Sequence, residues 1–94
     1  MKSSDYYGLF VDTVPDDIKK LYTEAGSSDF NALSQTAHRL KGVFAMLNLL
    51  PGKQLCESLE QHIADGDALK IENNISQIDF FVSRLLEQGS QQHE

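Results

Sequence analysis

The chain has 94 residues, 40% hydrophobic and 23% charged, a composition that suits one folded domain and excludes a disordered tail. Its formal net charge of −6 argues against nucleic acid and anionic membranes as primary partners. The single cysteine, Cys56, makes no internal disulfide, and no apolar run approaches the roughly 18 residues of a membrane span. We therefore expect a cytoplasmic domain that makes no direct membrane contact.

The N-terminal third of the chain predicts two helices. A short one runs from about Asp5 to Asp12. Thr13 is a candidate N-cap for the second, because Pro15 then falls in the first turn, where its missing N–H is tolerated. The second helix is expected to stop at Gly26 after apolar residues at helical spacing, which are Ile18, Leu21, Tyr22 and Ala25.

Two further helices are predicted in the middle of the chain. Ser27 or Ser28 is expected to cap a helix that spans about Asp29–Leu47. The segment Asn48–Gly52 is typical of a turn, and the next helix is expected to end near Ala64. The inward-facing residues of the two helices are expected to be Phe30, Leu33, Ala37, Leu40, Phe44 and Leu47, then Leu55, Cys56, Leu59 and Ile63.

The last predicted helix follows a tight connection at Asp65–Asp67 and ends at Gly89, which leaves residues 89–94 as a flexible polar tail. Its inward-facing residues are expected to be Ile71, Ile75, Ile78, Val82 and Leu85. Nothing in the pattern predicts a strand, and short connections between long amphipathic helices favour antiparallel neighbours. We therefore predict a single all-α domain, an antiparallel up-down four-helix bundle with a short extra N-terminal helix, whose helical part spans residues 5–88.

One strip of the helix predicted over Asp29–Leu47 lies beside its core stripe, since successive helical residues turn by about 100°. His38 and Lys41 are its only large members, and no acidic residue occurs between Phe30 and Cys56 although the chain has 14. An open histidine with a nearby cation suits phosphoryl acceptance, because the cation offsets the charge of the phosphate oxygens. The strip consists of Ser34, His38, Lys41, Gly42 and Ala45.

Antiparallel packing also predicts a partner for the imidazole. A turn centred near Leu49 sets His38 level with residues 60–62 of the following helix. Glu60 or Gln61 would then accept a hydrogen bond from Nδ1–H and leave Nε2 free to act as the nucleophile. A histidine on a helix is also commonly a surface or core residue, and helical spacing alone does not separate these interpretations.

Other kinds of site were weighed for the same residues. A metal site would draw on His38, Cys56, Glu60 and His62, but Glu60 and His62 diverge on one helix. Cys56 fits the core stripe, which also disfavours a nucleophilic pair with His38. We expect no metal site. A non-catalytic helical adaptor with an incidental His38 remains the main alternative function.

Two segments carry a family resemblance. The segment Ala37–Gly42, with the sequence AHRLKG, resembles the A-H-x-L-K-G signature of histidine-containing phosphotransfer (HPt) domains. The segment Leu55–Glu60, LCESLE, resembles the L-C-x-x-L-E segment of the next helix of that family, and the likeness covers roughly Pro15–Leu86. The stretch LFVDTVPDDIKKLYTEA adds likeness to members that form the cytoplasmic C-terminal domain of an inner-membrane sensor-type protein.

The resemblance implies a role for each matching residue. His38 would take the phosphoryl group on Nε2, Lys41 would pair with it, and Gly42 would leave steric access. Glu60, with Gln61 as the second choice, would orient the imidazole. The surface that contacts the partner would include Ser34, Gln35, Arg39, Val43, Ala45 and Met46.

The resemblance also implies the reaction and its partners. Phosphoryl groups would pass reversibly between His38 and the aspartates of receiver domains, one in a hybrid sensor kinase and one in a response regulator. The chain itself would carry no cofactor, ATP site or kinase activity, and Mg²⁺ would belong to the partner receiver. We expect the isolated domain to be a monomer.

Overall fold

Four helices make up the fold, and the prediction of an all-α domain is confirmed. The computed structural model describes the backbone of residues 2–92, together with the side chains from Phe10 to Glu87. No strand occurs in residues 2–92. The helices are α1 (Lys2–Gly26), α2 (Phe30–Met46), α3 (Leu50–Asp65) and α4 (Ala68–Gln92).

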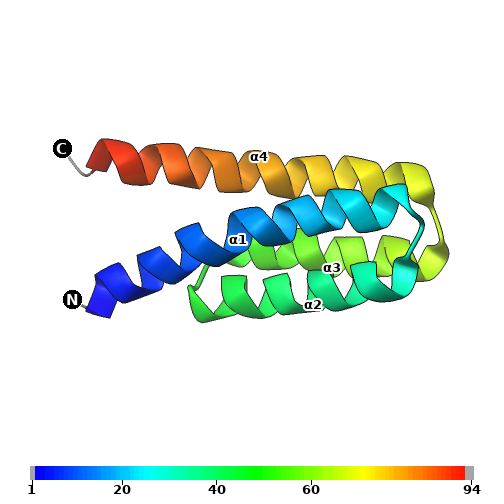
Figure 1. Ribbon diagram of the computed structural model, residues 1–94, viewed down its shortest axis with the longest axis horizontal. Coiled ribbons are helices and arrows are strands. Elements are labelled where there is room, and N and C mark those ends of the chain that lie inside the picture. Colours follow the sequence, from blue (N-terminus) through cyan, green and yellow to red (C-terminus); the bar gives the residue numbers. More distant parts are fainter. Residues whose placement is uncertain (1, 93–94) are drawn as a thin grey trace.

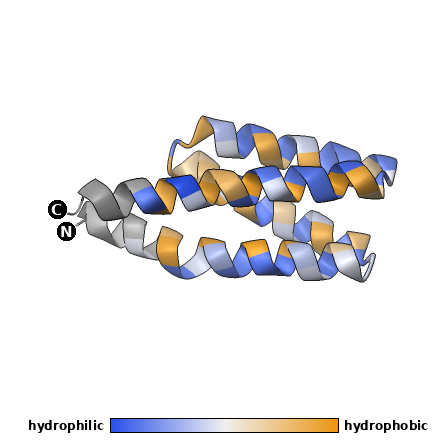
Figure 2. Cartoon of the chain, turned by 90° about the horizontal axis from the view of Figure 1, so that it is seen from above, coloured by the Kyte–Doolittle hydropathy of each residue, from blue (hydrophilic) through white to orange (hydrophobic). Residues whose placement is uncertain are grey.

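Each helix packs against two others. Both α1 and α3 lie against α2 and α4, and Figure 1 shows all four lying lengthwise beside one another. Hydrophobic and hydrophilic residues alternate along every helix, so that each can turn one apolar face inward (Figure 2). The core draws on all four helices and consists of Phe10, Val14, Ile18, Leu21, Leu33, Ala37, Leu40, Phe44, Cys56, Leu59, Ile63, Ile71, Ile75, Ile78 and Val82.

The short extra N-terminal helix was a wrong prediction. Instead of two helices, α1 runs without interruption from Lys2 to Gly26, so Thr13 is an interior residue and Pro15 lies within the helix. An interior proline removes one backbone hydrogen bond and costs about 3 kcal/mol. The cost is offset because one continuous helix buries a single apolar stripe on both sides of the proline, made of Phe10, Val14, Ile18 and Leu21.

The connections at the two ends of α2 also differ from the prediction. Asp29, rather than Ser27 or Ser28, caps α2, since its carboxylate accepts a hydrogen bond from the Ala32 N–H at 3.2 Å. At the other end the turn is shorter than the predicted Asn48–Gly52, because α3 already begins at Leu50. Pro51 is tolerated in the first turn of α3, where no backbone N–H is needed.

The connection to α4 is confirmed, whereas the predicted end of α4 is wrong. Gly66 takes a left-handed φ of 70° that ends α3, and Asp67 accepts a hydrogen bond from the Lys70 N–H at 3.2 Å. The helix then continues past Gly89 to Gln92. Glycine weakens a helix by about 1 kcal/mol without excluding helical φ and ψ, so it does not end one by itself. Residues 93–94 of the predicted tail lie outside the described residues.

Tyr22, one of the residues at helical spacing in the sequence, is exposed on α1. Its hydroxyl donates a hydrogen bond to Asp79 Oδ2 on α4, with an O–O distance of 2.9 Å. The phenol thus links the two helices at their surface rather than in the core.

An ion pair between a buried carboxylate and a half-exposed guanidinium joins α1 to α2. Asp17 is only 3% exposed, and its carboxylate accepts hydrogen bonds from Arg39 Nη2 at 2.8 Å and Arg39 Nε at 3.4 Å. Sequence reasoning placed Arg39 on the docking surface and assigned Asp17 no partner. In the structure the guanidinium, whose side chain is 50% exposed, is directed toward α1. Both residues of the pair therefore contribute mainly to holding α1 and α2 together.

We predict that Arg39→Ala lowers the free energy of unfolding by about 1–3 kcal/mol, because it leaves the buried Asp17 carboxylate without its charged donor. Urea unfolding followed by circular dichroism measures this change. Adding Asp17→Asn should recover part of the loss, and Lys20→Ala, on an exposed position of α1, serves as the control. An Arg39→Ala variant as stable as the Lys20→Ala control would contradict the prediction.

Candidate functional site

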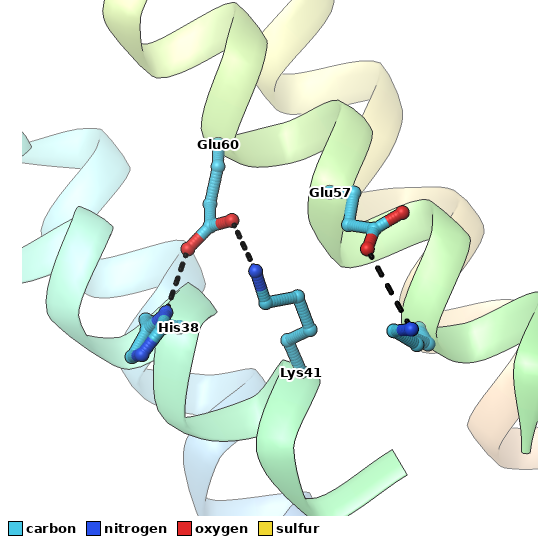
Figure 3. A network of polar contacts seen from close by, with 5 residues as sticks. His38, Lys41, Glu57 and Glu60 are labelled. Carbon is cyan, nitrogen blue, oxygen red and sulfur yellow. Dashed lines mark hydrogen bonds and ion pairs between the residues drawn. The ribbon is translucent and has the colours of Figure 1, made fainter. Parts of the chain in front are cut away.

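His38 stands on the outer side of α2 and meets one side chain from α3. Its side chain is 74% exposed, and Nδ1 lies 3.2 Å from Glu60 Oε2 (Figure 3). A carboxylate accepts hydrogen bonds only, so the contact favours the tautomer with a proton on Nδ1. Nε2 then keeps its lone pair and points away from Glu60.

Lys41 contacts the other oxygen of the same carboxylate. Its Nζ is 3.1 Å from Glu60 Oε1, and both side chains are about three-quarters buried, with 26% and 25% exposed. Gln61, the second candidate for the imidazole partner, donates instead to Asp65 Oδ1 on its own helix at 3.3 Å. The structure therefore brings Glu60, and not Gln61, to His38 and Lys41.

Gly42 leaves open space one turn from His38. A Cβ built on Gly42 would have no atom within 4 Å apart from its own helix neighbours, and the residue is exposed. Exposed positions around it include Met46, whose side chain is 58% exposed. Of the residues expected to contact a partner, four are exposed and two half-buried: Gln35, Arg39, Ala45 and Met46, and then Ser34 and Val43.

A second ion pair lies on α3, on the N-terminal side of Glu60. Lys53 Nζ lies 3.9 Å from Glu57 Oε2, one turn apart on the same helix (Figure 3). Both side chains are more exposed than that of Glu60, and such exposed pairs contribute little to stability. This second pair has the same residue types as Lys41 and Glu60, but it is Glu60 that contacts the imidazole.

Of the residues weighed for a metal site or a cysteine nucleophile, Glu60 contacts His38, whereas Cys56 lies in the core and His62 on another side of α3. Among residues 10–87, no three His, Cys, Asp or Glu side chains are grouped so as to hold a metal ion. Cys56 is in the core, and burial, with the Glu60 carboxylate nearby, raises the pKa of its thiol to about 12. The thiolate that a nucleophile requires is therefore scarce at neutral pH. His62 lies on the α4 side of α3, in a shallow cavity that it shares with Lys70 and Asn74.

Gly52 supports the site but escaped sequence reasoning, which treated it as a turn residue. It is buried in the first turns of α3, and a Cβ there would come within 2.7 Å of Phe81 Cε2 and 2.9 Å of Phe44 Cδ2. The absence of a side chain therefore lets α3 approach α2 and α4 closely. A glycine after a proline is an ambiguous signal, because the same dipeptide is typical of turns.

Three comparisons relate the chain to known proteins. The model of the Hpt domain family matches residues 5–91. Phosphotransferase RcsD of Escherichia coli strain K12 is 67% identical over 86 residues, which are 92% of this chain and 10% of that protein. The solution structure of the Escherichia coli YojN HPt domain aligns with a TM-score of 0.85 and 68% identity, over 89% of this chain and 72% of that one. The chain thus spans about a tenth of the length of the curated relative.

None of the described helices combines the length and the hydropathy that crossing a bilayer requires.

We predict opposite effects of alanine at two glycines. Gly42→Ala should raise the free energy of unfolding by about 0.5–1 kcal/mol, because the methyl group enters open space and alanine favours a helix. Gly52→Ala should lower it by about 1–3 kcal/mol, because the methyl group meets the rings of Phe44 and Phe81. Chemical denaturation of both variants measures these changes. Equal effects at the two positions would contradict the difference between open space at Gly42 and close packing at Gly52.

Proposed function

This chain belongs to the Hpt domain family, and from that premise we propose that it is a phosphorelay intermediate in two-component signalling. His38 accepts a phosphoryl group from the aspartate of one receiver domain and passes it reversibly to another. The observation that carries the proposal is an exposed imidazole whose Nδ1 is held by the Glu60 carboxylate. The similarity to a phosphotransferase supports group transfer as the reaction.

The chemical step uses the free nitrogen of the ring. The Nε2 lone pair attacks the phosphorus of the aspartyl phosphate, so an N–P bond forms as the acyl O–P bond breaks. The aspartate leaves as a carboxylate, and Nδ1 keeps the proton that it shares with Glu60. Lys41, one turn along α2, supplies a positive charge to the phosphoryl oxygens. In this proposal Mg²⁺ belongs to the receiver domain, and the chain needs neither a cofactor nor an ATP site.

Docking in this proposal centres on the exposed surface of α2. Gly42 gives a receiver domain access to His38, and Met46 offers apolar contact area. Arg39 adds positive charge near the site, although its pair with Asp17 limits its freedom to reach a partner. The partners are receiver domains of a hybrid sensor kinase and of a response regulator, and the net charge of −6 disfavours nucleic acid.

The proposal also covers the setting of the domain. The isolated domain is a monomer without kinase activity. It acts in the cytoplasm, as the C-terminal part of a longer inner-membrane sensor-type protein, in keeping with the small share of the curated relative that it matches.

We predict that His38→Ala folds like the wild type, because the side chain that it removes is exposed. The variant should accept no phosphoryl group from a phosphorylated receiver domain, because the nucleophile is gone. Incubation with ³²P-labelled receiver domain followed by gel autoradiography measures the transfer. His62→Ala, which alters a histidine on the α4 side of α3, should still be labelled. Labelling of His38→Ala at the wild-type level would instead favour a helical adaptor with an incidental histidine.

We predict that Gly42→Leu slows phosphoryl transfer from a receiver domain by more than about tenfold, because the side chain fills the approach to His38. The helix itself should keep its stability, since the position is open and leucine favours a helix. Ser83→Leu, an exposed position on α4, provides the matched control and should transfer normally. Normal transfer by Gly42→Leu would show that receivers do not approach over this residue.

A further inference from the structure

One carboxylate contacts two groups in the structure, His38 and Lys41, and phosphorylation of His38 would offer Lys41 a second anion. The geometry points to an exchange of ionic partners, an inference that rests on the proposed function. Glu60 holds Lys41 in the unphosphorylated domain. When His38 is phosphorylated, Lys41 leaves Glu60 for the phosphoryl oxygens, and Glu60 keeps the ring, which has become a cation.

The positions of the atoms show why Lys41 must change partner. Glu60 uses Oε2 for His38 Nδ1 at 3.2 Å and Oε1 for Lys41 Nζ at 3.1 Å, so both oxygens are engaged. Since Nδ1 faces Glu60, a phosphoryl group on Nε2 projects away from that carboxylate (Figure 3). The ammonium of Lys41 therefore starts in contact with the carboxylate rather than with the group that it would neutralise.

The exchange places one cation beside each anion. Before transfer, Glu60 carries one negative charge beside the Lys41 ammonium and a neutral imidazole. Attack by Nε2 forms the N–P bond, the acyl O–P bond breaks and the donor aspartate leaves with the electron pair. Because Nδ1 keeps its proton, the ring gains a positive charge next to Glu60. The phosphoryl dianion then takes Lys41, and each anion keeps one cation.

Because Lys41 and Glu60 are partly buried, the loss of their attraction affects the free energy of phosphorylation. The Lys41 and Glu60 side chains are about one-quarter exposed, so solvent screens their attraction less than that of the more exposed Lys53 and Glu57. Lys41 stabilises phosphohistidine by its attraction to the phosphoryl group. The net stabilisation is smaller than that attraction, because Lys41 loses its attraction to Glu60. Glu60→Gln removes this reduction, because an amide oxygen still accepts from Nδ1–H but has no charge to hold an ammonium.

A double-mutant cycle tests the exchange on the intact domain. The fraction of His38 phosphorylated is measured by ³¹P NMR in a buffer of phosphoramidate and ammonia, which supplies the phosphoryl group without a protein partner. Lys41→Met is made in the wild type and in Glu60→Gln. We expect Lys41→Met to lower the phosphorylation equilibrium constant about two- to fivefold more in Glu60→Gln than in the wild type.

The opposite result has a definite structural meaning. If Lys41 instead bridged Glu60 and the phosphoryl group, Glu60 would help to place it, and Lys41→Met would have an equal or smaller effect in Glu60→Gln. That outcome overturns the exchange. Glu57→Gln is the control, because Glu57 pairs with Lys53 and should leave the effect of Lys41→Met unchanged.

A second readout follows Lys41 directly. The ¹³C resonance of its ε-methylene should move on phosphorylation of the wild type, because the ammonium changes its anionic partner. A resonance that stays in place on phosphorylation contradicts the exchange. Wild-type protein that forms no phosphohistidine overturns the proposed function and the exchange together, whereas phosphohistidine without the expected coupling overturns the exchange alone.

Discussion

The Glu60 carboxylate lies between the His38 imidazole and the Lys41 ammonium, and the whole site depends on that placement. Two of the three groups come from α2 and the third from α3. The site therefore exists only while these helices keep one register, since a shift by one residue would rotate Glu60 by about 100° away from α2. The proposed phosphoryl transfer makes three demands on the domain. It must hold one ring nitrogen, expose the other and keep a cation within reach.

Packing at the loop end of the two helices fixes that register. The connection is short, and Asn48 in it takes a left-handed φ of 61°, which asparagine tolerates better than most residues. Gly52 then lets α3 lie directly against Phe44 of α2. On the other flank of α2, the ion pair of Asp17 and Arg39 ties it to α1. The exposed histidine thus stands on a helix whose two flanks are both held.

Sequence periodicity was sufficient for the parts of the fold that depend on local repetition. It placed most of the core on α2, α3 and α4, and the level of His38 with residues 60–62 followed from the position of the turn. It failed at Pro15, which lies inside α1 because tertiary packing outweighs the local signal, and at Gly89, which α4 passes because a glycine alone does not end a helix. The choice of Glu60 over Gln61 and the pairing of Arg39 with buried Asp17 needed three-dimensional contacts. Spacing alone left His38 ambiguous, and the matching motif segments supplied the hypothesis that it accepts a phosphoryl group.

The most direct test of the account is ¹⁵N and ³¹P NMR of the His38 ring before and after phosphorylation. The contact with Glu60 predicts a proton on Nδ1 and a deprotonated Nε2 in the resting domain, followed by one-bond ³¹P–¹⁵N coupling to Nε2. A resting ring with its proton on Nε2, or a phosphoryl group on Nδ1, would contradict the claim that Glu60 sets the nucleophile.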